Sequence, residues 1–287
     1  MIIVTGANGQ LGRAVVEQLL QRVPADQIGV SVRDTQKAKE LEERGVRVRQ
    51  GEFNDAESLA HTFEGASQVL IVSSNSRGEE AVHQHRTAID MAKKAGASRI
   101  LYTSHMGSSP TSHFPPMVDH AATEEALKAS GVTFTSLRNG FYASSILWLL
   151  SDALKTGELV APVDGPVAWT SHADLAEVTA IALSEHSLDG VTPNLTASEA
   201  MDLNDIVVVA SEVVGRSIGR VIVPDDEYRA RLLSHGLPEG MVDMSLGMFL
   251  ASRQGAFART DPTLARLIDR PPITVRDILR TSISSIG

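Results

Sequence analysis

Three glycines near the start of the chain have the spacing of a phosphate-binding turn. Gly6, Gly9 and Gly12 follow the apolar run 2–4 and precede a helical run. Such glycines permit a sharp turn off a strand, a close approach of a pyrophosphate to the backbone, and tight packing of the next helix. The phosphates then lie at a helix N-terminus, where free N–H groups favour negative charge. A glycine triplet alone is a weak motif, and its spacing here is GxxGxxG. Its position directly after a strand favours a dinucleotide-binding turn formed by Gly6, Ala7, Asn8, Gly9, Gln10, Leu11 and Gly12.

The residues after the second apolar run bear on the choice of cofactor. Arg33 follows the expected strand 28–32. An acid at this point accepts hydrogen bonds from ribose hydroxyls, whereas an arginine binds a 2′-phosphate. Asp34 keeps the NADH alternative open, but the first strand-end residue more often faces the ribose. We therefore predict NADPH in preference to NADH, with Lys37 either adding a second charge or standing in solvent.

Polar residues end two further expected strands. Ser73, Ser74 and Asn75 follow the apolar run 68–72, and Thr103 and Ser104 end the run 99–104. Ligands bind at the carboxyl ends of parallel strands, so we expect these side chains near the cofactor. Ordinary loop solubility is the alternative for residues 73–75.

The acid–base pair of short-chain dehydrogenases, YxxxK, is absent. In those enzymes a lysine lowers the pKa of a tyrosine that protonates the developing alkoxide. The three tyrosines here have Met106, Ile146 and Leu232 four positions on. Epimerase-like or dehydratase-like chemistry, which normally needs that pair, is therefore disfavoured.

The sequence offers little for a metal. His83 and His85 are two residues apart on an expected helix, so they point in different directions, and we interpret both as part of a solvated face. The absence of cysteine excludes thiolate zinc sites, disulfides and cysteine nucleophiles. We predict no metal.

Strand and helix patterns alternate through the first half of the chain, which predicts an α/β fold with a doubly wound parallel sheet. The helix after the fifth strand is expected to run from Asp119 to Ser130. We expect a dinucleotide-binding Rossmann domain over 1–155 and a smaller mixed α/β lobe over 156–287. A strand near 192–196 is expected to return to the main sheet, so the two lobes interleave in sequence and no clean boundary between them is expected.

Several motifs together resemble one family, the NmrA-like atypical short-chain dehydrogenase/reductases. They are the strand followed by TGANGQLG, Val-Arg33, His120-x-x-Thr-Glu124, Thr-x-Leu-Arg-Asn139-Gly-x-Tyr142 and the segment 165–176. Within that family the sequence is most similar to the bacterial type 2 quinone oxidoreductases and the triphenylmethane reductases.

The resemblance implies NADPH-dependent reduction of a quinone or related conjugated acceptor by direct hydride transfer, without a flavin. Carried over by position, Asn139, Gly140 and Phe141 would lie along the nicotinamide, and His120 would contact the acceptor. Tyr142 and Trp169 would contact the substrate. The family also includes NADP-binding redox sensors without turnover, which is the alternative.

Charge and composition limit the partners. The chain of 287 residues has a formal net charge of −9 and no basic tract, so nucleic acid and anionic membranes are not expected partners. A small-molecule acceptor is expected, and a homodimer is compatible with the sequence. No signal peptide or apolar run of membrane-spanning length is recognisable, so we expect a cytoplasmic protein.

Overall fold

The computed structural model describes residues 1–186 and 188–284, and these divide into two compact units. The first unit comprises residues 1–110, 116–139 and 172–195. The second comprises residues 111–115, 140–171 and the chain from 196 onward. None of the helices in the described residues is both long and apolar enough to cross a membrane.

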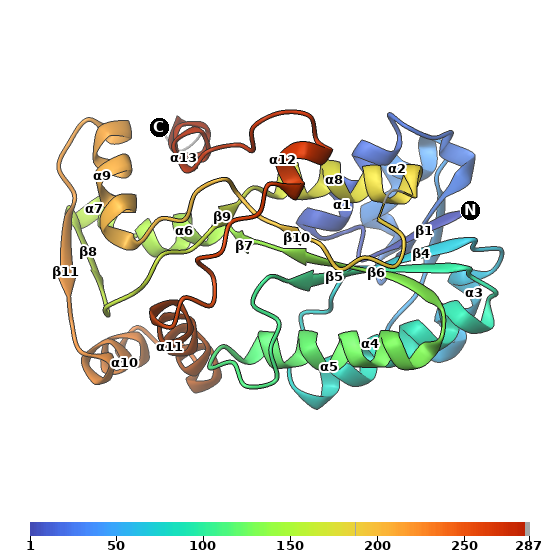
Figure 1. Ribbon diagram of the computed structural model, residues 1–287, viewed down its shortest axis with the longest axis horizontal. Helices are drawn as coiled ribbons and strands as arrows, with labels where there is room; N and C mark the ends of the chain where they lie inside the picture. Colours follow the sequence, from blue (N-terminus) through green and yellow to red (C-terminus); the bar gives the residue numbers. More distant parts are fainter. Residues whose placement is uncertain (187, 285–287) are drawn as a thin grey trace. The chain divides into compact units, whose positions relative to one another are not determined.

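The first unit is built on a seven-stranded parallel sheet, which confirms the predicted fold class (Figure 1). The strand order is β10-β6-β5-β4-β1-β2-β3. The strands are β1 (Ile2–Thr5), β2 (Ile28–Val32), β3 (Arg47–Gln50), β4 (Gln68–Ile71), β5 (Arg99–His105), β6 (Thr133–Asn139) and β10 (Asn194–Leu195). Strands β1, β2, β4 and β5 are buried along their whole length, as expected for strands that are covered on both faces.

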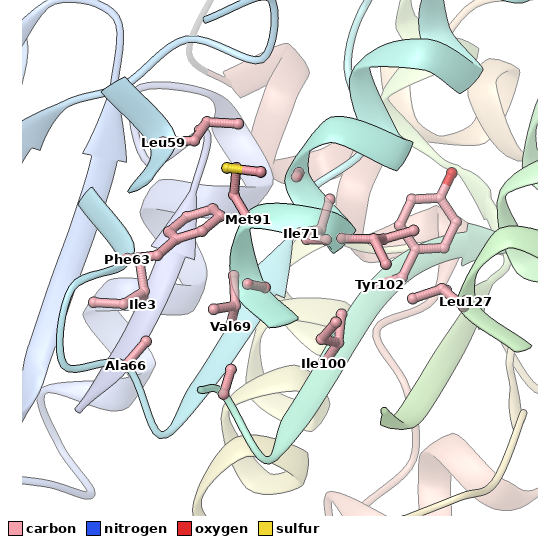
Figure 2. Close-up of a cluster of buried hydrophobic side chains, with 14 residues drawn as sticks. Ile3, Leu59, Phe63, Ala66, Val69, Ile71, Met91, Ile100, Tyr102 and Leu127 are labelled. Carbon is pink, nitrogen blue, oxygen red and sulfur yellow. The ribbon is translucent and has the colours of Figure 1, made fainter. Parts of the chain in front are cut away.

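Helices cover both faces of this sheet. On one face, α1 (Gln10–Leu19) packs against α8 (His172–Glu185), and α3 (Ala56–Phe63) packs against α4 (Glu79–Lys94) on the other (Figure 1). The remaining elements are α2 (Lys39–Glu43), α5 (Pro115–Ser130) and the 3₁₀ turns η1 (Ala25–Gln27) and η2 (Thr35–Ala38). Figure 2 shows the core between β1, β4, β5 and the helices α3, α4 and α5, with Phe63, Met91 and Tyr102 among its largest side chains.

The second unit combines short parallel strand pairs with helices. Strand β8 (Glu158–Ala161) pairs with β11 (Gly219–Ile222), and β7 (Phe141–Tyr142) pairs with β9 (Trp169–Thr170). Its helices are α6 (Ser144–Leu150), α7 (Ala153–Thr156), α9 (Leu203–Val214), α10 (Asp225–Ser234), α11 (Glu239–Arg253), α12 (Thr263–Leu267) and α13 (Val275–Ser284).

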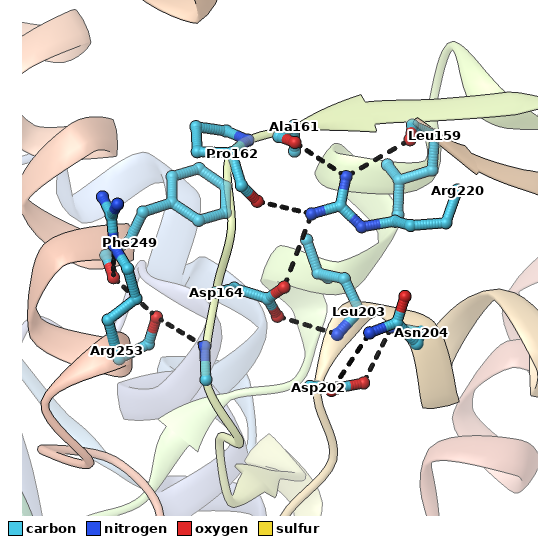
Figure 3. A network of polar contacts seen from close by, with 12 residues as sticks. Leu159, Ala161, Pro162, Asp164, Asp202, Leu203, Asn204, Arg220, Phe249 and Arg253 are labelled. Atoms are coloured by element: carbon cyan, nitrogen blue, oxygen red, sulfur yellow. Dashed lines mark hydrogen bonds and ion pairs between the residues drawn. The ribbon is translucent and has the colours of Figure 1, made fainter. Parts of the chain in front are cut away.

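A buried arginine ties this second unit together (Figure 3). The Arg220 guanidinium donates to the carbonyl oxygens of Ala161 at 2.8 Å and Pro162 at 2.5 Å. It also lies 3.4 Å from the carboxylate of Asp164, which accepts a hydrogen bond from the Leu203 N–H at 2.8 Å. One side chain thereby links β8, β11 and the start of α9.

The division of the chain differs from the predicted boundary between residues 155 and 156. The first unit ends at Asn139, because β7 pairs with β9 and not with the main sheet. The chain then returns to the first unit through α8 and β10, and β10 pairs in parallel with β6. Two units that interleave in this way have no single boundary in the sequence.

Candidate active site

A cleft of about 760 Å³ lies in the first unit at the carboxyl ends of its strands. Seven of the predicted cofactor residues line it, which are Gly6, Asn8, Gly9, Arg33, Ser73, Ser74 and Asn75. Ala7, Leu11 and Gly12 are buried beneath the turn. The volume is within the range of ligand clefts, and its location is where ligands bind in doubly wound sheets.

The glycine turn has the geometry that its sequence predicts. Gly6 has a φ of +65°, a conformation that other residues rarely adopt. A Cβ on Gly12 would lie 2.4 Å from the Gly6 carbonyl oxygen, so only glycine lets α1 pack this closely. Gly9 is the N-cap of α1 and supplies no side-chain cap, and the first helical N–H bond is from Arg13 to the Gly9 carbonyl. The N–H groups in the first turn of α1, before Arg13, have no helical partner and can therefore bind phosphate oxygens.

The two charged residues after β2 have different roles. Asp34 caps η2, since its carboxylate accepts the Gln36 N–H at 3.0 Å, and its other oxygen lies 3.9 Å from the Lys37 ammonium. Arg33 is exposed in the cleft and forms no ion pair within the described part of the chain. The Asn8 side chain donates to the Asp34 carbonyl at 2.7 Å, which fixes the end of β2 against the glycine turn. Arg33 is thus available to a ligand, and Lys37 also lines the cleft.

Cleft residues that the sequence analysis did not select come from the ends of β3 and β4 and from α4. They include Gly51, Glu52, Phe53 and Gln84. Asp55 follows residues 51–53 and caps α3, since its carboxylate accepts the N–H groups of Glu57 and Ser58. Residues 51–53 directly follow a third parallel strand. Because ligands bind at the carboxyl ends of such strands, this position could have identified them from the sequence.

Ser104 belongs to a buried ionic network. Its hydroxyl donates to Glu124 at 2.6 Å, and Ser136 and Arg138 donate to the same carboxylate. Burial alone would raise the pKa of Glu124, but hydrogen bonds from Arg138, Ser104 and Ser136 hold it below its usual range. The Ser104 hydroxyl, which we expected near the cofactor, therefore donates its hydrogen bond to Glu124 within the protein. Thr103 accepts the Ser73 N–H at 2.8 Å and so supports the cleft from below.

His120 lies in a row of aromatic rings. Its Nδ1 is 2.7 Å from the Tyr102 hydroxyl, and its ring stacks on that of His105 with centroids 6.3 Å apart. Burial lowers the pKa of His120 to about 4, despite the opposing effect of Glu124, and lowers that of His105 to about 3. The imidazole of His120 is therefore neutral near pH 7.

The predicted position of His120 at a helix start is wrong. Helix α5 begins at Pro115, because proline is well suited to a first helical turn, and this places His120 in the second turn. Burial and not the positive end of the helix is what keeps the ring neutral.

The interpretation of His83 and His85 as one solvated face is correct only for His83. His85 is 2% exposed and its Nε2 accepts the Ser74 N–H at 2.9 Å. Its pKa is lowered to about 3 by burial and by the nearby His120. The two histidines point in different directions on α4, so that His83 is exposed to solvent and His85 is buried. The described residues contain no cluster of side chains suited to a metal ion.

The remaining predicted residues divide between the units. Asn139 is fully buried at the end of β6, and its side-chain amide has no hydrogen-bond partner in the described residues. In the second unit Phe141 packs edge-on against Trp169 with ring centroids 5.3 Å apart. A Cβ on Gly140 would lie 2.0 Å from the Thr170 hydroxyl. Their roles, and that of half-buried Tyr142, stay predictions.

Comparison with known proteins identifies the family of the chain. The NAD(P)H-binding family matches residues 6–186. The chain belongs to this NAD(P)H-binding family. It is 34% identical to quinone oxidoreductase 2 of Escherichia coli, over 96% of each chain.

Two solved structures are similar throughout. The NADPH complex of the Escherichia coli NADPH-dependent quinone oxidoreductase superposes with a TM-score of 0.94 at 32% identity, covering 99% of this chain and 100% of that one. The NADP(H) complex of Citrobacter triphenylmethane reductase has a TM-score of 0.92 at 30% identity, covering 98% and 100%. These similarities confirm the predicted family and the prediction of an NAD(P)H-dependent oxidoreductase.

Proposed function

We propose that this protein uses NADPH to reduce a quinone or a related conjugated acceptor by direct hydride transfer, without a flavin. The observation that carries the proposal is the cleft lined both by the glycine turn and by Arg33, which forms no ion pair with any described residue. The names of similar proteins support the same chemistry, since they are a quinone oxidoreductase and a triphenylmethane reductase that were solved with NADPH and NADP(H).

The residues of the cleft fit NADPH in particular. The first-turn N–H groups of α1 suit the pyrophosphate, and Gly9 leaves space above them. Arg33 suits a 2′-phosphate because a guanidinium binds that group through paired hydrogen bonds. Asp34 is the residue that would favour NADH, but its carboxylate caps η2 by accepting the Gln36 N–H.

Bound NADPH would supply a hydride, which carries two electrons, and the quinone would then take one proton to become a hydroquinone. A quinone accepts a hydride without a strong acid, which agrees with the missing YxxxK pair. His120 would assist as a neutral donor. If the Tyr102 hydroxyl donates to its Nδ1, the ring proton is on Nε2 and can stabilise negative charge on the acceptor oxygen.

The alternative is a sensor that binds NADP without turnover. The two functions differ in one experiment, in which the purified protein is mixed with NADPH and a panel of quinones and the NADPH absorbance is followed. The proposal predicts quinone-dependent loss of NADPH. Tight NADPH binding without oxidation by any acceptor would favour the sensor.

A further inference from the structure

The loop that follows β4 is held almost entirely by side chains. This loop, residues 72–78, contributes Ser73, Ser74, Asn75 and Ser76 to the cleft. Five of its backbone N–H groups donate to side chains, as follows: Val72 to Thr5, Ser73 to Thr103, Ser74 to His85, Ser76 to Ser74, and Gly78 to Asp119. The loop therefore owes its shape to residues of β1, β5, α4 and α5.

The contact between Ser74 and His85 fixes the proton position on the imidazole. A backbone N–H can only donate, so Nε2 of His85 must be an unprotonated acceptor. The ring proton is then on Nδ1, which lies 2.9 Å from the Thr123 hydroxyl oxygen. That hydroxyl in turn donates to the Asp119 carbonyl at 2.8 Å. Each donor and each acceptor in this row therefore has a partner of the right kind.

The surroundings of His85 keep the ring in this state. The rings of Phe53 and Tyr102 contact it edge-on, with centroids 6.3 Å and 5.2 Å away. Burial among these groups disfavours the imidazolium, in accordance with its lowered pKa. A second ring proton would also place N–H against N–H at Ser74.

We propose that His85 is a positioning residue for the dinucleotide, which holds the loop 73–76 in its binding shape by accepting the Ser74 N–H. The inference rests on the proposed function, because the loop lines the proposed NADPH cleft. It gives His85 a task distinct from that of His120, since His85 would act through backbone and touch neither cofactor nor acceptor.

Two substitutions separate the acceptor role from simple packing. In His85→Gln the side-chain amide reaches the position of Nε2 and can still accept from Ser74. In His85→Asn the amide ends near Nδ1 and cannot. We expect NADPH to bind roughly tenfold more weakly to His85→Asn, the scale of one lost hydrogen bond, and within about threefold of wild type to His85→Gln. Exposed His83→Gln is the matched control and should bind like wild type.

A second measurement needs no substitution. In wild-type protein with ¹⁵N-labelled histidine, Nε2 of His85 should show the chemical shift of an unprotonated nitrogen. A protonated Nε2 would overturn the inference, as would folded His85→Asn protein that binds NADPH like wild type.

The outcomes also separate this inference from the proposed function. Loss of NADPH affinity in His85→Asn with no quinone turnover in wild type would leave the role of His85 intact and refute quinone reduction. Quinone turnover in wild type with equal NADPH affinity in His85→Asn would do the reverse.

Discussion

Arg33 and Asp34 are neighbours of opposite charge, and the structure gives them separate tasks. Asp34 is used within the protein as the cap of η2, whereas Arg33 extends into the cleft without a carboxylate partner among the described residues. The sequence favoured Arg33 from strand geometry alone. The cap gives a physical reason, because a carboxylate already engaged by backbone N–H is less available to a ribose.

The role of Arg33 leads to a prediction on cofactor choice. Arg33→Asp should weaken NADPH binding by about 2–3 kcal/mol and hardly change NADH binding, because it removes a charge-assisted hydrogen bond and adds repulsion. Calorimetric titration with both cofactors measures this. Lys39→Asp, the same charge change at an exposed residue outside the cleft lining, should alter neither affinity. Equal losses for both cofactors would refute the assignment.

His120 has a neutral ring near pH 7 because burial lowers its pKa to about 4. His120→Ala should lower kcat/KM for a quinone by roughly tenfold to a hundredfold, the scale of one hydrogen bond, with NADPH affinity unchanged. His61→Ala, at an exposed histidine, is the control. Full quinone activity in His120→Ala would remove this residue from the mechanism.

At the scale of elements, the turn between β1 and α1 carries the phosphate site. Gly9 has φ −86° and ψ 166°, values that valine adopts, and the nearest atom to a Cβ there is the Gly6 oxygen at 3.3 Å. Gly9→Val should therefore fold but lose dinucleotide binding, because its side chain fills the space for the pyrophosphate. Circular dichroism tests whether the Gly9→Val protein is folded, and calorimetric titration with NADPH tests whether it still binds the dinucleotide.

A matched change in the same turn should behave differently. Gly12→Val would force a side chain against backbone 2.4 Å away, so it should destabilise the fold itself. Retained NADPH affinity in Gly9→Val would show that the phosphates bind elsewhere.

The strands of the sheet could be predicted from the sequence more completely than the helices. Strands such as 28–32 were predictable because a run buried on both faces is apolar throughout. Helix α5 begins at Pro115 and not at the expected Asp119, because proline is favourable in a first helical turn. The burial of His85 could not be predicted from the sequence, because α4 has both an exposed and a buried face. The hydrogen bond that His85 accepts also depends on a backbone N–H from the loop before α4.

At the scale of the whole molecule, three histidines with lowered pKa values make folding stability depend on pH. The pKa of His85 and of His105 is lowered to about 3, and that of His120 to about 4, from a usual value of 6.5. Below pH 6.5 the unfolded chain therefore binds more protons than the folded one. Stability is therefore lost as pH falls from about 6.5 toward 4, because the unfolded chain takes up protons that the folded rings exclude.

Urea denaturation over that pH range measures the effect. In His105→Asn the amide oxygen can still accept the Gly107 N–H, which Nδ1 accepts at 3.1 Å in wild type, but the titration is gone. The slope of unfolding free energy against pH should be smaller by about 1 kcal/mol per pH unit. An unchanged slope would contradict the burial of a neutral His105.

The central claim is that a hydride passes directly from NADPH to the acceptor on this protein. The most direct measurement is the rate of quinone reduction, without added flavin, with NADPH that carries deuterium in one or the other C4 position. The account predicts a slower single-turnover rate for one of the two labelled forms only, and loss of one NADPH for each hydroquinone formed. Absence of quinone-dependent NADPH oxidation, or activity that appears only when flavin is added, would contradict it.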